Sequence, residues 1–168
     1  MDDVSSQIAV WSRRAPSVRL ARLASTRNEL AAMIRGVDAS TLSRRPAPKA
    51  WAAVEIVCHL RDLEESFHER IALIVVADEP RFPTTHPDRW ALERQYLRHD
   101  ANAAAAAFVA WRGETLALFE RLGSGDWERA GYQVDSRGRR TIDDFLAVMA
   151  WHDENHLAQL ARALAGRP

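Results

Sequence analysis

Three of the six histidines in this sequence have the spacing of a metal-binding site. His152 and His156 are four residues apart, which on a helix places both imidazoles on one face, one turn from each other. His59 lies in a separate segment, on an apolar stripe between Ile56 and Leu63. Neutral imidazole is the commonest protein ligand for zinc, and it also suits nickel, copper and iron. The sequence therefore predicts a divalent-metal site formed by His59, His152 and His156, with zinc favoured and nickel as the alternative.

Three histidine ligands would leave a coordination position open, as in catalytic zinc sites, whereas structural sites are closed by four protein ligands. A metal-bound water there would have a pKa of ~7 and could act as nucleophile or base, so no side chain is assigned a catalytic role. One alternative is a set of hydrogen-bonded core histidines that binds no metal, but a third histidine on a separate helix favours the metal. A zinc protease is excluded because Asp153 replaces the glutamate of the HExxH motif and few residues follow His156.

Metal-bound histidines usually donate their second ring N–H to a carboxylate or another oxygen. Glu55 and Asp62 lie four residues before and three residues after His59, so either could orient its ring. Gln159 follows His156 by three residues and could do the same. We therefore expect Asp62, Glu55 and Gln159 to be the candidates for hydrogen bonds to the metal ligands.

Other reactive side chains near these motifs are expected to have structural roles. Asp153 lies off the inward stripe of its helix, which predicts a surface position or a dimer contact. Cys58 lies about 100° around the helix from His59 and is expected to pack in the core. The other histidines are expected to be surface or loop groups: His68, His86 and His99. Trp51 is expected to anchor the entry to the second long helix.

Four long segments have apolar residues at helical spacing, which predicts an all-α four-helix bundle. Thr141 and Asp144 form a variant of the capping box at the start of the last segment. Three prolines between 78 and 87 predict a long irregular connection between the second and third helices. A short helix is expected over 88–97 and a weak strand over 132–134. The predicted long helices span residues 17–36, 52–77, 102–122 and 141–164.

Size, charge and composition exclude several classes of protein. A chain of 168 residues fits a single domain. Its 23 basic and 23 acidic residues are mixed along the chain, which disfavours nucleic-acid binding. No apolar run approaches the ~20 residues needed to span a membrane, and the N-terminus does not resemble a signal peptide. The single cysteine excludes an internal disulfide, so we expect a cytoplasmic protein.

Two motifs resemble those of a known family. The segment from Trp51 to Glu64 has the pattern W-x-x-x-E-I-x-x-H-L-x-D-x-E, and the segment from His152 to Gln159 has the pattern H-x-x-x-H-x-x-Q. Together they resemble the DinB-like superfamily, which includes YfiT-type proteins classed as metal-dependent hydrolases and a group of thiol-dependent transferases. The similarity spans about residues 20–165, so residues 1–16 are expected to form an N-terminal extension of a single domain over 1–168.

The resemblance implies an up-down-down-up bundle, commonly a homodimer, with a divalent metal on the three histidines. It also implies a small-molecule substrate. The reaction would be hydrolysis or the transfer of a low-molecular-weight thiol such as bacillithiol or mycothiol. Thiol transfer is slightly favoured because the inward stripes offer no obvious general base. The alternative is a non-catalytic, stress-associated dimeric bundle that binds metal.

Overall fold

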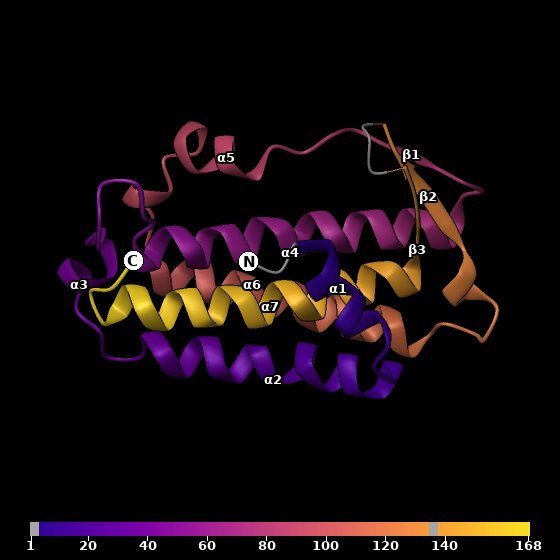
Figure 1. Cartoon of the computed structure of the whole chain (residues 1–168), viewed down its shortest axis with the longest axis horizontal. Coiled ribbons are helices and arrows are strands. Elements are labelled where there is room, and N and C mark those ends of the chain that lie inside the picture. Colours follow the sequence, from indigo (N-terminus) through magenta and orange to yellow (C-terminus); the bar gives the residue numbers. More distant parts are fainter. Residues whose placement is uncertain (1–3, 135–137) are drawn as a thin grey trace.

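The computed structural model describes residues 4–134 and 138–168. Four long helices form the body of the molecule (Figure 1), as predicted: α2 (Pro16–Ile34), α4 (Ala53–Val76), α6 (Ala101–Glu120) and α7 (Ile142–Leu164). Both α2 and α4 pack against α6 and α7, so α2 lies diagonally across the bundle from α4. The predicted bounds agree with the observed ones to within two residues at each end.

Two clusters of buried residues show the direction in which each helix runs. One cluster joins the end of α2 and the end of α7 to the starts of α4 and α6. The other joins the starts of α2 and α7 to the ends of α4 and α6. Helices α4 and α6 are therefore parallel to each other and antiparallel to α2 and α7. This is the up-down-down-up order that the family resemblance implied.

A long connection makes this order possible by returning the chain along the length of α4 (Figure 1). It contains the short strand β1 (Arg81–Phe82), helix α5 (Pro87–Glu93) and a 3-10 turn, η1 (Tyr96–Arg98). The prolines before α5 prevent regular helix over this stretch, as expected. A second short helix, α3 (Ala39–Ser43), lies between α2 and α4, over residues for which no helix was predicted.

A small sheet closes one end of the bundle. Strand β2 (Ala130–Gln133) pairs in parallel with β1 and antiparallel with β3 (Gly138–Thr141), after the 3-10 turn η2 (Asp126–Glu128). Gly131 allows this packing, because a Cβ there would lie 2.4 Å from the ring of Phe82. Only a weak strand over 132–134 was predicted, because strands this short show no clear alternation of apolar and polar residues. In addition, β1 pairs with residues far along the chain, and a local sequence pattern does not show such a pairing.

From Val4 onward, the N-terminal extension is part of the packed structure. Helix α1 (Val4–Ser12) lies across α7 (Figure 1). The indole of Trp11 donates to Glu154 at 3.0 Å, and that of Trp151 donates to Gln7 at 2.9 Å. Among the described residues, none of the helices has the length and apolar character needed to cross a membrane.

The capping box at the start of α7 is confirmed. The Thr141 hydroxyl accepts from the Asp144 amide at 3.0 Å, and the Asp144 carboxylate accepts from the Thr141 amide at 2.9 Å. These bonds satisfy amides that lack partners at a helix start and fix where α7 begins. The register of the histidines farther along α7 follows from that starting point.

Candidate metal centre

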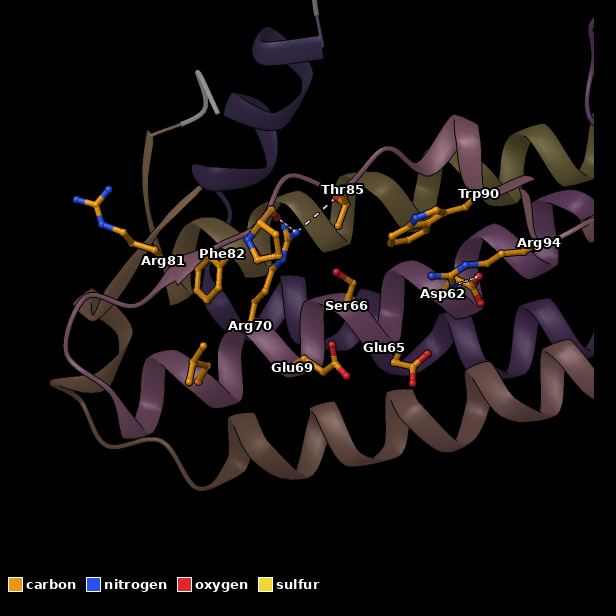
Figure 2. A pocket seen from close by; sticks show the side chains of 12 residues that line it. Asp62, Glu65, Ser66, Glu69, Arg70, Arg81, Phe82, Thr85, Trp90 and Arg94 are labelled. Atoms are coloured by element: carbon orange, nitrogen blue, oxygen red, sulfur yellow. Dashed lines mark hydrogen bonds and ion pairs between the residues drawn. The ribbon is translucent and has the colours of Figure 1, made fainter. Parts of the chain in front are cut away.

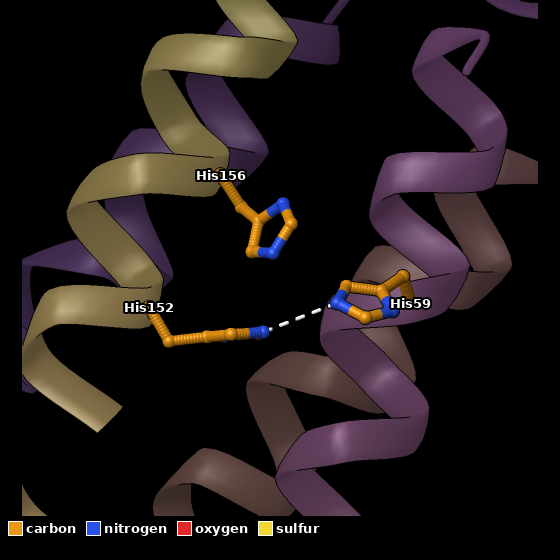
Figure 3. Close-up of side chains that lie close together, drawn as sticks. All are labelled: His59, His152 and His156. Carbon is orange, nitrogen blue, oxygen red and sulfur yellow. Dashed lines mark hydrogen bonds between the residues drawn. The ribbon is translucent and has the colours of Figure 1, made fainter. Parts of the chain in front are cut away.

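The structure brings His59 of α4 together with His152 and His156 of α7 (Figure 3). One ring nitrogen from each histidine lies within 4.8 Å of the other two. The Nε2 atoms of His59 and His152 are 3.1 Å apart. The site forms because α4 and α7 are neighbouring antiparallel helices. Their inward-facing apolar stripes lie against each other at the positions of the three histidines. Three separate sequence positions thus converge on one point, as the spacing predicted.

Hydrogen bonds define which ring nitrogens are available. His156 donates its Nδ1–H to the side-chain oxygen of Gln159 at 2.7 Å. That bond fixes the tautomer and leaves the Nε2 lone pair of His156 free to bind a cation. Nδ1 of His59 is buried and has no hydrogen-bond partner among the described residues. The imidazole of His59 is therefore held by ring contacts and not by a carboxylate.

Trp51 covers two of the imidazoles. Its ring centroid lies 4.9 Å from that of His59 and 6.5 Å from that of His156, stacked on the latter. We expected Trp51 only to anchor the entry to the helix. The structure adds a contact with two of the three histidines, which the position of Trp51 in the family pattern could have indicated.

The surroundings keep all three imidazoles neutral. Burial, together with the neighbouring His156, lowers the pKa of His59 to about 3. Burial and the two other histidines hold the pKa of His152 well below its usual value. Burial also lowers the pKa of His156, although Gln159 and Asp153 oppose the shift. Neutral imidazoles present the lone pairs that a divalent cation requires, so the donor set fits zinc or nickel.

Of the three predicted hydrogen-bond partners, only Gln159 bonds a histidine. Glu55 instead accepts from the Ala52 amide at 2.9 Å and from Arg45, which closes the start of α4. Asp62 accepts from the Tyr96 hydroxyl at 2.6 Å and from Arg61 and Arg94. Asp62 acts on His59 through its charge alone, which favours the protonated imidazole.

The prediction that Asp153 lies on the surface or at a dimer contact is wrong. Asp153 is 1% exposed and binds the Arg112 guanidinium at 2.5 and 3.0 Å. The same guanidinium donates to Glu64 at 2.7 Å and to the Leu23 carbonyl at 3.0 Å. The sequence pattern could not show this, because the partner that makes burial of Asp153 favourable comes from another helix. Arg112 thus joins α2, α4, α6 and α7 directly behind the histidines.

The remaining candidates stay outside the site. Cys58 is fully buried, and burial raises its pKa to about 11, consistent with a packing role. His68 lies 3.3 Å from the Thr115 hydroxyl, with its ring beside Trp111. His86 and His99 are exposed.

A cleft of about 840 Å³ opens onto the three histidines. Trp51, Leu63 and Trp151 provide apolar walls, and Lys49 and Arg162 lie at its exposed rim. No carboxylate is found among the described residues that line it. A separate groove of about 440 Å³ lies between α4 and residues 81–94 (Figure 2) and includes none of the three histidines. The cleft is therefore where a substrate could reach the centre.

Comparison with known proteins assigns the family. A sequence model of the DinB superfamily matches residues 22–160. The chain belongs to the DinB superfamily. It is 22% identical over 144 residues to a protein of Oceanobacillus iheyensis named "Putative metal-dependent hydrolase", covering 82% of this chain and 79% of that one. It is 23% identical over 140 residues to a protein of the same name from Halalkalibacterium halodurans, with the same shares covered.

The DinB-superfamily fold is also seen in a solved structure. YfiT from Bacillus subtilis superposes with a TM-score of 0.82 at 19% identity, covering 88% of this chain and 85% of that one. It is described as "a probable metal-dependent hydrolase with an unusual four-helix bundle topology". The likeness confirms the predicted four-helix bundle.

Proposed function

We propose that this protein is a metal-dependent enzyme that acts on a small molecule at the site formed by His59, His152 and His156. The observation that carries the proposal is the convergence of three neutral imidazoles, within 4.8 Å of one another, at the base of an open cleft. The names of the relatives support the dependence on metal. We propose zinc as the resident ion, with nickel as the alternative.

The residues around the histidines would prepare the site for catalysis. A divalent cation held there would supply a Lewis acid that activates water or a thiol. Gln159 holds the His156 ring at a fixed angle, and Trp51 covers the imidazoles on one side. Lys49 and Arg162 place positive charge at the rim, which would attract anionic substrates. Hydrolysis is the reaction that the relatives' names indicate, and it is our first candidate.

Transfer of a low-molecular-weight thiol is the second candidate. It is favoured by one observation: no carboxylate among the described residues lines the cleft, so no acidic side chain there could serve as a general base. Thiol transfer needs only an activated thiolate and a pocket for the electrophile. A homodimer, implied by the family resemblance, is part of the same proposal and can be checked by light scattering.

Metal analysis tests the proposed centre directly. Protein purified without an immobilised-metal column should contain about one divalent ion per chain, as expected for a single three-ligand site. His156→Ala should lose that ion. His86→Ala, which replaces an exposed histidine outside the site, is the matched control and should retain it. Equal metal contents in wild type and His156→Ala would refute the centre.

Activity assays then separate the two reactions from a non-catalytic bundle. The metallated protein is incubated with ester and amide substrates, and in parallel with cysteine and a model electrophile. Turnover in either assay that is lost in His156→Ala identifies the reaction class. Turnover that persists in His156→Ala would argue against catalysis at this site.

A further inference from the structure

A second cavity continues from the histidines into the molecule. It has a volume of about 440 Å³, within the range of small-molecule sites. It shares Leu63, Trp151 and His152 with the open cleft. Toward the end of the bundle that the sheet closes, Phe145 and Gln133 line it. A molecule whose reactive group lies at the histidines could therefore extend its remaining part into this cavity.

Aromatic rings run along the wall of the cavity from the histidines toward the sheet. The ring of Phe67 lies edge-on to His152, with the centroids 5.9 Å apart, and edge-on to Phe145, with the centroids 6.2 Å apart. Phe67 and Phe145 both line the cavity. Aromatic rings attract one another in edge-to-face and offset arrangements, beyond the effect of burying their area. An aromatic group inside the cavity would therefore extend an existing cluster of rings.

The pairing of the strands turns Gln133 toward the bundle. Gln133 is the register partner of Phe82 in strand β1, and paired residues project from the same side of a sheet. Phe82 is 2% exposed and packs edge-on against Phe145, so this side of the sheet faces the core. The side chain of Gln133 is consequently buried, with 6% of the residue exposed, where it lines the cavity.

The side-chain oxygen of Gln133 has no hydrogen-bond partner among the described residues. A buried acceptor without a partner lowers stability, and native proteins contain few of them. Each one therefore requires an explanation, and a molecule bound beside it is one. A ligand that donates an O–H or N–H group at this point would supply the missing hydrogen bond.

The charged groups that line the cavity favour a neutral ligand. Arg70 donates to the Pro83 carbonyl at 3.1 Å, and both Arg70 and Arg140 are engaged in interactions within the protein. Among the described residues, no carboxylate lines the cavity. An ionic group would lose its hydration here without meeting an unpaired counter-charge, and that loss is costly. A neutral donor needs only the Gln133 oxygen.

We propose that this cavity binds the non-reacting end of the substrate, and that this end is a neutral aromatic group with an O–H or N–H donor, such as a phenol or an indole. The aromatic ring contacts Phe67 and Phe145, and its donor bonds the side-chain oxygen of Gln133. The assignment rests on the proposed function, because it takes the histidines as the place of reaction.

NMR titration of the isotope-labelled protein with para-cresol and with para-fluorotoluene tests the proposal. The two molecules have nearly the same size, but only para-cresol can donate a hydrogen bond. It should bind about fivefold more tightly, as expected for one hydrogen bond, and should shift the side-chain amide signals of Gln133. Gln133→Met keeps the length of the side chain and removes the acceptor, so it should reduce binding of para-cresol to the level of para-fluorotoluene.

Tyr132→Phe is the matched control, because Tyr132 precedes Gln133 on β2 and projects from the other side of the sheet. It also removes a polar group and should leave both affinities unchanged. Val148→Phe places a larger side chain at the cavity wall and should weaken binding of both compounds. Thermal melting should show that all variants are folded.

Three results would overturn the assignment. Wild-type protein might bind neither compound, or bind both with equal affinity, and these two results do not depend on any variant. The third is a preference for para-cresol that Gln133→Met leaves unaltered, since the donor would then bind elsewhere.

Turnover and metal content keep the two proposals apart. Any turnover found should be inhibited competitively by para-cresol, and about fivefold less potently in Gln133→Met. If the protein contains no metal and shows no turnover but still prefers para-cresol through Gln133, the proposed function fails and the cavity remains a binding site for the donor. If metal and turnover are present and this preference is absent, the cavity assignment fails alone.

Discussion

At the scale of single residues, the centre depends on how each imidazole is oriented. Gln159 is the one predicted partner that bonds a histidine, and its oxygen can accept from His156 only if the proton is on Nδ1. The side chain of Gln159 therefore selects the tautomer whose Nε2 lone pair is free to bind a cation. Such orienting contacts commonly contribute tenfold or more to metal affinity.

We predict that Gln159→Leu weakens metal binding about tenfold, because the His156 ring loses the bond that fixes its tautomer. Competition with a chromogenic chelator measures the change. Gln159→Glu retains an oxygen acceptor and should bind at least as tightly as wild type. Unchanged affinity in Gln159→Leu would show that packing alone orients His156.

The lowered pKa values of the histidines predict how stability of the metal-free protein depends on pH. In the folded state the pKa of His59 is about 3, whereas in the unfolded chain it is near ~6.5. Below pH ~6.5 the unfolded chain binds more protons, so the free energy of unfolding should fall as the pH falls, by up to ~1.4 kcal/mol per pH unit for each such histidine.

Urea unfolding of metal-free protein between pH 6 and pH 4 measures this slope. His59→Gln removes one of the three groups and should have a shallower slope than wild type. His86→Gln replaces an exposed histidine and should keep the wild-type slope. Identical slopes in wild type and His59→Gln would contradict the assignment of a neutral, buried His59.

At the scale of secondary-structure elements, Arg112 connects the four long helices. Its guanidinium binds Glu64 of α4, Asp153 of α7 and the Leu23 carbonyl of α2, and all of these side chains are nearly inaccessible to solvent. Burial lowers the pKa of Arg112, but the two carboxylates raise it by more, so the side chain stays charged. Because Asp153 adjoins His152 in sequence, this network also fixes the rotation of α7 about its axis.

We predict that Arg112→Met destabilises the fold by about 3–5 kcal/mol, because it leaves two buried carboxylates without a counter-charge. Urea unfolding measures the loss. Arg89→Met is the matched control, since Arg89 forms an exposed pair with Glu93 at 3.0 Å and should contribute less than about 1 kcal/mol. Adding Glu64→Gln and Asp153→Asn to Arg112→Met should recover part of the stability. Similar losses for Arg112→Met and Arg89→Met would contradict this role.

Helices with apolar residues at a regular spacing were predictable from the sequence. Features formed by contacts between segments far apart in the sequence were not. The four long helices follow from apolar residues at helical spacing, and the start of α7 follows from Thr141 and Asp144. The convergence of the histidines followed from the inward stripes. The burial of Asp153 and the pairing of β1 with β2 depend on contacts between segments far apart in the chain, which local pattern does not contain.

At the scale of the whole molecule, helix α1 contributes Val4 to the lining of the cleft that opens onto the histidines, although it is remote from them in sequence. Trp11 is 4% exposed and packs with residues of α7. We predict that Trp11→Ala loosens α1 and makes it sensitive to limited proteolysis, while metal content stays at the wild-type level because all three ligands lie on α4 and α7. Trp127→Ala, which removes an aromatic ring beside Phe119, is a control that should leave α1 protected. Loss of metal in Trp11→Ala would contradict the independence of the centre from α1.

The joining of α4 to α7 also has a consequence for folding rates. His59 and His152 are separated by 93 positions, so the complete ligand set exists only after α4 and α7 have docked. The entropy of loop closure opposes contacts between segments so far apart, so we expect this contact to form late in folding. A bound ion should therefore slow unfolding strongly while changing the refolding rate little, since interactions absent from the transition state act on the unfolding step. Stopped-flow measurements of the unfolding and refolding rates, with and without chelator, test this expectation. Slower unfolding with a nearly unchanged refolding rate would show that the ion stabilises the assembled bundle kinetically.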